Sequence, residues 1–281
     1  MPIIPNETYF CIFEHIVPPN ESLTREQVRV FINLSCVCRL FANFCLPRIF
    51  ESLVLFTSVC PDFTSALLRN DATCEALRSV ALCTRIAAKE PLALALAKVV
   101  RRCCFAYWVL NHTENRRLAR KYIAGMLHMT NIHELHFVSS SMDEELWNAI
   151  ATLPSLKKLT FMWCRSLQGP ANVKPEKRIR VRVPHLQILR RSVGFHQALA
   201  VNIDAQCLRA LDIDCMRLDQ VDWHLLSSLT ELGFYSERDG ALHGSEEPFM
   251  ERLHVFLVQA PQSLESLRLA VDNVGVAQTA Y

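Results

Sequence analysis

Apolar residues recur along the chain in a frame of six positions whose first, fourth and sixth members are apolar, with Arg191 as an exception. The frame occurs at Phe50/Leu53/Leu55, Leu77/Val80/Leu82, Phe105/Trp108/Leu110, Ile132/Leu135/Phe137, Leu156/Leu159/Phe161, Leu186/Leu189/Arg191, Leu208/Leu211/Ile213, Leu229/Leu232/Phe234 and Leu264/Leu267/Leu269. Since half of the residues are apolar, one frame alone arises by chance about one time in eight. Chance does not supply the spacing of the first positions, mostly 21 to 30 residues, or the 17 leucines among the 27 positions. The pattern therefore predicts an internal repeat.

Segments of helical periodicity lie between the frames. One such segment is residues 142–150. Ser141 is placed to cap a helix there, and Leu146, Ile150 and Leu153 share one face of it. Three later frames follow a proline, which ends a helix and favours an extended entry into a strand: Pro154, Pro184 and Pro261. Units of strand, turn, helix and turn bury their apolar edges only by stacking. We therefore expect residues 51–281 to form an α/β fold, a curved solenoid of leucine-rich repeats with a parallel sheet on its concave side.

Residues 1–50 have helical periodicity instead of the repeat. Asn6 is placed to cap a first helix, which ends at Pro18 and Pro19. The apolar face of this helix comprises Tyr9, Ile12, Phe13 and Ile16. A polar stretch at residues 22–27 opens a second helix. A third is expected around Leu34, Val37, Cys38 and Phe41.

Two short motifs lie near the ends of this helical region. The first comprises Ile4, Pro5, Glu7, Ile12 and Ile16, at the spacing of Leu-Pro-x-Glu followed by two apolar residues. The second is Val37-Cys38-Arg39-Leu40-Phe41, which matches Val-Cys-Arg-x-Trp with Phe in place of Trp. These are the motifs of the F-box family, so residues 1–50 resemble an F-box. Residues 46–55 are similar to the junction found in fungal F-box proteins that continue as leucine-rich repeats.

The resemblance implies a docking function. F-boxes bind the Skp-type adaptor of an SCF-type cullin-RING ubiquitin ligase, and the attached repeats hold the target protein. The residues that would contact the adaptor are Ile4, Pro5, Ile12, Ile16, Leu34, Val37, Cys38 and Phe41. A three-helix unit of this size has more apolar surface than its own core absorbs, which is compatible with a partner. Such a subunit contributes proximity to catalysis, so no enzymatic residue is expected.

Two other classes of function remain open. One is a non-catalytic repeat scaffold whose first fifty residues only cap the solenoid. It predicts that Ile12, Ile16 and Val37 pack on the first repeat, whereas docking predicts that they are exposed. The other is an α/β enzyme, which would require a deep pocket with converging polar groups.

Composition narrows the partners and cofactors. The formal net charge of +2 favours neither nucleic acid nor a membrane surface. With 7 glycines the chain has no Gly-rich phosphate loop, and His133 and His136 fall on opposite faces of an expected strand. We therefore expect no cofactor and no metal. The 12 cysteines include no Cys-x-x-Cys pair and lie in apolar stretches, which is typical of reduced proteins of the cytoplasm or nucleus. Lys98, Arg101 and Arg102 interrupt the most apolar stretch, so no membrane span is expected.

Period-two alternation assigns side chains to the open, concave face of the expected sheet. They are Tyr107, Val109, Asn111, Glu134, His136, Val138, Lys158, Thr160, Met162, Ile188, Arg190, Asp212, Asp214, Glu231, Tyr235, Ser266 and Arg268. Because interfaces favour Tyr, Met and Arg anchors, this face is either a protein-binding surface or simply solvated. The candidate contacts to a target protein are Tyr107, His136, Lys158, Met162, Arg190, Asp212 and Tyr235. The basic segment 174–182 is interpreted as a solvated insertion loop with a short edge strand at residues 178–183, rather than as a phosphate site.

Overall fold

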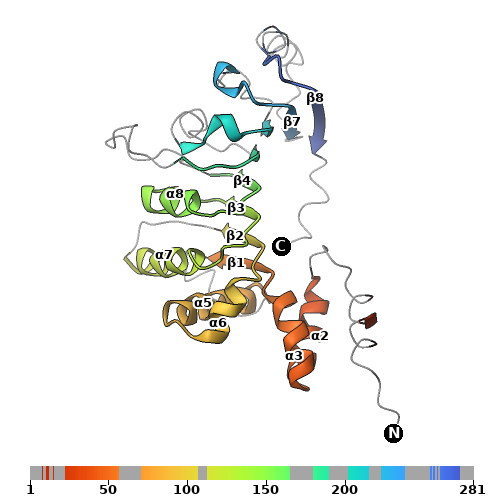
Figure 1. Ribbon diagram of the computed structural model, residues 1–281, viewed down its shortest axis with the longest axis vertical. Coiled ribbons are helices and arrows are strands. Elements are labelled where there is room, and N and C mark those ends of the chain that lie inside the picture. Colours follow the sequence, from red (N-terminus) through yellow and green to blue (C-terminus); the bar gives the residue numbers. More distant parts are fainter. Residues whose placement is uncertain are drawn as a thin grey trace.

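Figure 1 shows the computed structural model of the chain. The structure describes residues 23–56, 71–106, 113–164, 180–189, 202–214, 223–237 and 260–272, together with single positions between 8 and 15 and between 254 and 258. The frame at Phe105/Trp108/Leu110 and the basic segment 174–182 lie partly outside these residues.

Strands and helices alternate along most of the described chain. The strands are β1 (Ser52–Phe56), β2 (Arg102–Ala106), β3 (Glu134–Val138), β4 (Lys158–Met162), β5 (His185–Leu189), β6 (Ala210–Asp214), β7 (Glu231–Glu237) and β8 (Ser266–Asp272). The α-helices are α2 (Arg25–Ser35), α3 (Arg39–Ile49), α5 (Asp71–Ala87), α6 (Pro91–Ala97), α7 (Thr113–Met126) and α8 (Glu144–Ala151). Two 3₁₀ turns follow, η2 (Ala205–Cys207) and η4 (Trp223–Leu226).

The eight strands form one sheet whose order is the order of the chain, from β1 to β8. Every neighbouring pair is parallel. Helices α5, α6, α7 and α8 lie on one side of the strands, and α2 and α3 lie beyond β1 (Figure 1). The predicted α/β class and parallel sheet are confirmed.

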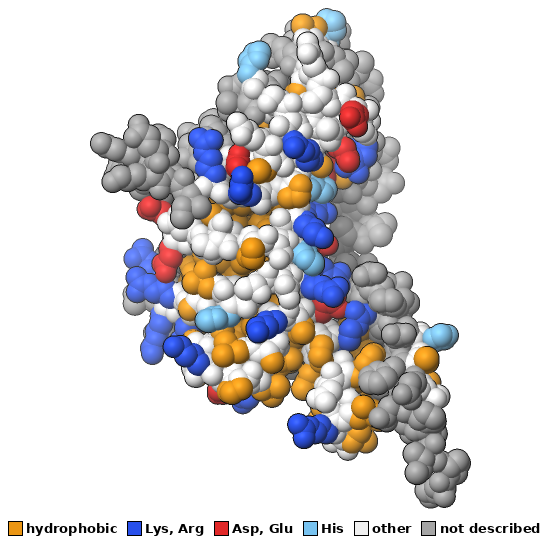
Figure 2. All heavy atoms as spheres, in the orientation of Figure 1, with side chains coloured by type: hydrophobic (Ala, Val, Ile, Leu, Met, Phe, Trp, Pro, Cys, Tyr) orange, Lys and Arg blue, Asp and Glu red, His pale blue; other side chains and the backbone are white. Residues whose placement is uncertain are grey.

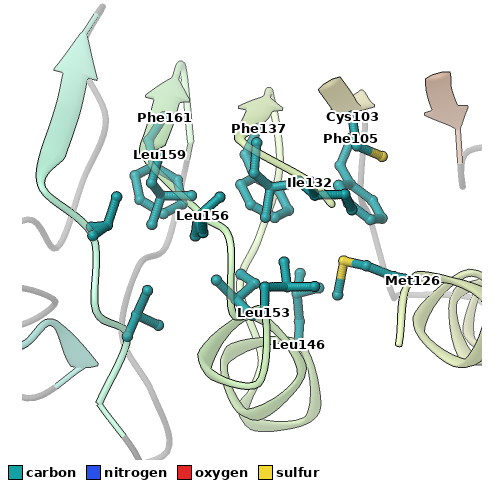
Figure 3. Close-up of a cluster of buried hydrophobic side chains, with 14 of the residues drawn as sticks. Cys103, Phe105, Met126, Ile132, Phe137, Leu146, Leu153, Leu156, Leu159 and Phe161 are labelled. Atoms are coloured by element: carbon teal, nitrogen blue, oxygen red, sulfur yellow. The ribbon is translucent and has the colours of Figure 1, made fainter. Parts of the chain in front are cut away.

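The sheet face toward the helices carries the apolar positions of the repeat. Pairing in register aligns the buried residues of successive strands, so that Phe105 lies beside Phe137 and Phe137 beside Phe161. The ring centroids of these two pairs are 5.0 Å and 5.4 Å apart and the rings are stacked. Figure 3 shows these rings on the side of the strands where Met126 and Leu146 approach from the helices. Each buried aromatic or aliphatic side chain of this kind contributes about 1.5–3 kcal/mol to the hydrophobic stabilisation.

One backbone junction recurs between successive units. The carbonyl of the residue just before a strand accepts two consecutive N–H groups, which belong to the residue before the next strand and to the first residue of that strand. The acceptors are Glu51 for Arg101 and Arg102, Arg101 for His133 and Glu134, His133 for Lys157 and Lys158, Pro184 for Arg209 and Ala210, Arg209 for Thr230 and Glu231, and Thr230 for Glu265 and Ser266. Lys157 accepts from His185 alone, because Pro184 holds the place of the other donor and has no N–H. The units are therefore equivalent in backbone as well as in side-chain pattern.

Three predicted frames are misplaced. The frame at Leu77 lies inside helix α5, where an apolar stripe with helical spacing imitates it. The other two begin earlier than predicted, at Val100 and Val183, whose side chains are fully buried. The actual frames start at these valines, whereas the predicted frames start at a later large apolar residue, Phe105 or Leu186.

Two strand ends repeat the same corner. Ser139 follows β3 and Trp163 follows β4, and both have positive φ, 48° and 53°. The side chain of the next residue is buried between a carbonyl of its own strand and one of the preceding strand. Ser140 Oγ lies 2.9 Å from the carbonyl of Val138 and 3.2 Å from that of Phe105, and Cys164 Sγ lies 3.5 Å from the carbonyls of Met162 and Phe137. Left-handed backbone costs a non-glycine residue about 1–2 kcal/mol. The hydrogen bonds to the preceding strand offset that cost and fix the corner.

Helices α2 and α3 form a separate small core. Phe31, Cys45 and Ile49 are buried together, and Leu46 and Phe50 pack against both this cluster and the core of the sheet. The predicted second helix is confirmed, and its N-cap Thr24 forms a capping box with Gln27.

Two predicted helix boundaries are wrong. The residues assigned to a third helix do not share one: Leu34 lies in α2, Val37 in the connecting turn, and Cys38 is the extended N-cap of α3. Helix α8 is capped by Asp143, whose carboxylate accepts from the N–H of Leu146 at 2.8 Å, and not by Ser141. Both errors arise because side-chain spacing places a helix face well and its ends poorly.

Candidate functional site

The sheet face opposite helices α5–α8, called the opposite face below, presents three rows of side chains. Neighbouring strands lie about 4.8 Å apart, so side chains in register form continuous rows across the sheet. The first row is Ser52, Arg102, Glu134, Lys158, His185, Ala210, Glu231 and Ser266. The second row is Val54, Cys104, His136, Thr160, Gln187, Asp212, Gly233 and Arg268. The third row contains Ala106, Val138, Met162 and Leu189, and Tyr235 farther along the sheet.

The rows differ in chemistry. Half of the residues of the first row are charged, those of the second are mostly polar, and those of the third are mostly apolar and half-buried. Figure 2 shows Lys, Arg, acidic and His side chains gathered in a column along the strands, on the side away from α7 and α8.

Five of the predicted target-binding residues lie on this face. His136 and Asp212 belong to the second row, Lys158 to the first, and Met162 and Tyr235 to the third. Tyr107 and Arg190 lie outside the described residues. The assignment of Ile188 to the face was wrong: it is buried in the core, because the predicted frame was displaced by three positions and an odd displacement exchanges the two faces of a strand.

A polar network runs through the second row. Thr160 Oγ1 donates to Gln187 Oε1 at 3.1 Å, and Gln187 Nε2 donates to Asp212 Oδ2 at 2.6 Å. From the first row, His185 Nε2 lies 2.6 Å from the same oxygen and donates to it. Arg268 Nη2 lies 3.5 Å from the other oxygen, Oδ1, and 3.6 Å from Glu231 Oε2. The network links strands β4 to β8.

Asp212 is the centre of this network, and its side chain is 1% exposed. Oδ1 is buried and has no hydrogen-bond partner. Burial acts to raise the pKa of Asp212, but hydrogen bonds from His185 and Gln187 and the charges of His185 and Arg268 outweigh it, so the pKa lies below its usual value. The carboxylate is therefore ionised in the folded protein at neutral pH.

Gly233 makes room for that carboxylate. It is the register partner of Asp212 on β7, and a Cβ built on it would overlap Oδ1. Tyr235 Cε2 lies 3.4 Å from the same Cβ position. A side chain at position 233 would therefore displace the carboxylate, while glycine lets Arg268 approach Asp212 across β7.

Sequence reasoning missed His185, Gln187 and Gly233. The displaced frame at Leu186 hid the first two, because it placed them away from the open face. Gly233 interrupts the apolar and polar alternation of β7, and a glycine within a strand signals the close approach of another group. That signal was present in the sequence.

A second candidate surface lies on the helical pair. Of the predicted adaptor contacts, Ile12 is 49% exposed, Val37 is 67% exposed, Cys38 is exposed, and Leu34 and Phe41 are half-buried beside the small core. Ile4, Pro5 and Ile16 lie outside the described residues. Sequence reasoning missed Val30 and Ile32, which are also exposed. Figure 2 shows apolar side chains over α2 and α3.

The described cysteines are free thiols. Burial raises the pKa of Cys83 to about 12 and that of Cys164 to about 11, and burial together with nearby Cys38 raises that of Cys45 to about 11. These thiols are protonated at neutral pH and act as small apolar side chains.

Within the parts of the chain that the structure describes, His, Cys, Asp and Glu form no group of three that could hold a metal ion. The helices in those parts lack the length and apolar composition needed to cross a membrane.

Comparison with protein-family models finds no match, and comparison with curated proteins finds none.

Proposed function

We propose that this chain is the substrate-recognition subunit of an SCF-type cullin-RING ubiquitin ligase. In this proposal the N-terminal helices are an F-box that binds a Skp-type adaptor. The strand and helix units are leucine-rich repeats of a curved solenoid, and their opposite face binds the target protein. The chain then contributes no catalytic group and acts by holding the target near a ubiquitin-loaded enzyme.

The observation that carries the proposal is the exposed apolar surface of the helical pair. Val30 and Ile32 on α2, Val37 in the turn after it, and Ile12 earlier in the chain are exposed although each is a large apolar residue. The core of the pair, around Phe31, is complete without them. Several exposed large apolar side chains on a small helical unit are compatible with a surface that a partner protein covers.

The packing of the pair bears on the scaffold alternative. A pure cap would bury Ile12 and Val37 on the first repeat, yet both are exposed. Contact with the sheet core is made instead by Leu46 and Phe50, at the far end of α3. The pair is thus joined to the repeats through one end, and the surface that carries the F-box motif residue Val37 remains free for docking.

The opposite face supports the substrate-binding half of the proposal. Its three rows combine charged, polar and apolar side chains over neighbouring strands, and Tyr235 and Met162 are residue types that anchor protein interfaces. Stacked parallel repeats present such a face as one continuous surface.

The test is capture of the full chain by a purified Skp-type adaptor. We expect wild type to be captured and Val37→Asp to lose at least about tenfold in affinity, because a charge placed in an apolar interface must be desolvated. Leu92→Asp is the matched control, since Leu92 is 60% exposed and lies on α6, which is not part of the helical pair. Equal capture of wild type and Val37→Asp, or no capture of wild type, would contradict the proposal.

A further inference from the structure

Asp212 has one oxygen whose hydrogen-bonding capacity is unused. Oδ2 accepts from His185 and Gln187, whereas Oδ1 is buried and has no hydrogen-bond partner. A buried carboxylate oxygen normally accepts at least one hydrogen bond. Oδ1 therefore marks a place where a donor fits.

Arg268 occupies that place only at ion-pair distance. Its Nη2 atom is 3.5 Å from Asp212 Oδ1 and 3.6 Å from Glu231 Oε2. Hydrogen bonds between a guanidinium and a carboxylate are about 2.7–2.9 Å long. Arg268 reaches Asp212 from β8, across Gly233 on β7, so its backbone tether limits the approach. Its side chain is 53% exposed and can leave the site without unfolding the sheet.

We propose that Asp212 and Glu231 form a subsite for an arginine side chain of a bound protein segment. The incoming guanidinium displaces Arg268 and donates to Asp212 Oδ1 and Glu231 Oε2. Because it has no tether to β8, it reaches hydrogen-bond distance of Oδ1. This deepens the proposed function, because it names a chemical feature of the target protein.

The chemistry selects arginine. The planar guanidinium has five donors in a fixed fork and can bridge two carboxylates, as Arg268 already does at longer range, whereas the compact ammonium of lysine bridges them less well. The ring of Tyr235 borders Gly233 beside this site. An acidic side chain would instead meet two carboxylates.

Binding is measured by fluorescence anisotropy on the full chain without adaptor. The probe is the fluorescein-labelled hexapeptide Gly-Ser-Arg-Gly-Ser-Gly, and its two matched versions carry lysine or citrulline in place of arginine. Arg268→Ala removes the internal competitor, so we expect it to bind the arginine peptide about tenfold more tightly than wild type. We expect weaker binding of the lysine peptide and none of the citrulline peptide. Arg182→Ala is the control, because it removes an arginine paired with Asp204 outside the three rows.

The comparison of Arg268→Ala with wild type is decisive, since that substitution changes only a half-exposed side chain. Equal affinities, or equal binding of the arginine and citrulline peptides, would overturn the proposal. In the Arg268→Ala background, Glu231→Gln should weaken binding of the arginine peptide severalfold, and unchanged binding would also count against the site. Loss of adaptor capture with retained peptide binding would refute the ligase function alone, and the reverse result would refute this subsite alone.

Discussion

Substitution of Gly233 by alanine tests the central contact of the opposite face. The new Cβ would overlap Asp212 Oδ1, so either the carboxylate or strand β7 must move by well over an ångström. Movement of the carboxylate strains or breaks hydrogen bonds from His185 and Gln187 that are each 2.6 Å long. Hydrogen bonds to a charged group contribute about 1.5–3 kcal/mol each, so we expect Gly233→Ala to lower the free energy of unfolding by about 2–4 kcal/mol.

A double-mutant cycle separates this clash from a general intolerance of the strand. Asp212→Ala removes the carboxylate, and in that background Gly233→Ala should be neutral or stabilising by up to about 1 kcal/mol, because glycine is unfavourable within a strand. Urea unfolding followed by circular dichroism gives the four free energies. A cost of Gly233→Ala that is the same with and without Asp212 would refute the reasoning.

Three further predictions concern other parts of the molecule. At pH 8, a thiol reagent should label exposed Cys38 rapidly but label Cys83 only after unfolding, because Cys83 is buried and burial raises its pKa to about 12. Peptide mass spectrometry identifies the labelled cysteines, and early labelling of Cys83 would contradict the packing. Because the pKa of Asp212 is lowered in the folded state, its contribution to stability is present above the usual carboxyl range near about pH 4 and is lost as pH falls through the lowered value. Urea midpoints between pH 6 and pH 2.5 should therefore fall more steeply for wild type than for Asp212→Asn, and parallel curves would exclude this linkage. Thr24→Ala should cost about 1 kcal/mol through loss of the capping box of α2, seen as a lower unfolding midpoint, while Thr130→Ala, at an exposed turn, serves as the neutral comparison.

The sheet was predictable because its signal is repeated. Leu135, Leu159, Leu211 and Leu232 lie on neighbouring parallel strands, as their frames predict. Besides the frame at Leu77, which lies inside α5, two predicted frames were misplaced. Their strands belong to frames that begin at Val100 and Val183, but a frame that begins at a later phenylalanine or leucine matched the pattern equally well. Spacing alone cannot separate two frames within one apolar stretch, and here hydrogen bonding and burial decide.

The network around Asp212 was only partly predictable. Alternation placed Asp212 and Arg268 on the open face correctly. It does not show which residues of different strands lie side by side, because that depends on the strand register. His185 and Gln187 come from β5, the strand whose frame was displaced, so their donation to Asp212 could not be foreseen.

In the helical region, too, one feature was predictable from the sequence and another was not. The capping box of Thr24 and Gln27 can be recognised in the sequence because its two residues are three positions apart. The turn between α2 and α3 was not, because Cys36, Val37 and Cys38 carry no glycine or proline to mark it.

The paired corners at Ser139 and Trp163 have a consequence for how the chain is assembled during synthesis. Ser140 contacts β2, and Cys164 contacts β3, so part of each corner is held by a strand that has already left the ribosome. The N–H of Ser139 also donates to the carbonyl of Met162 on β4 at 2.9 Å, so the first corner is completed only when the next unit has been synthesised and has paired with it.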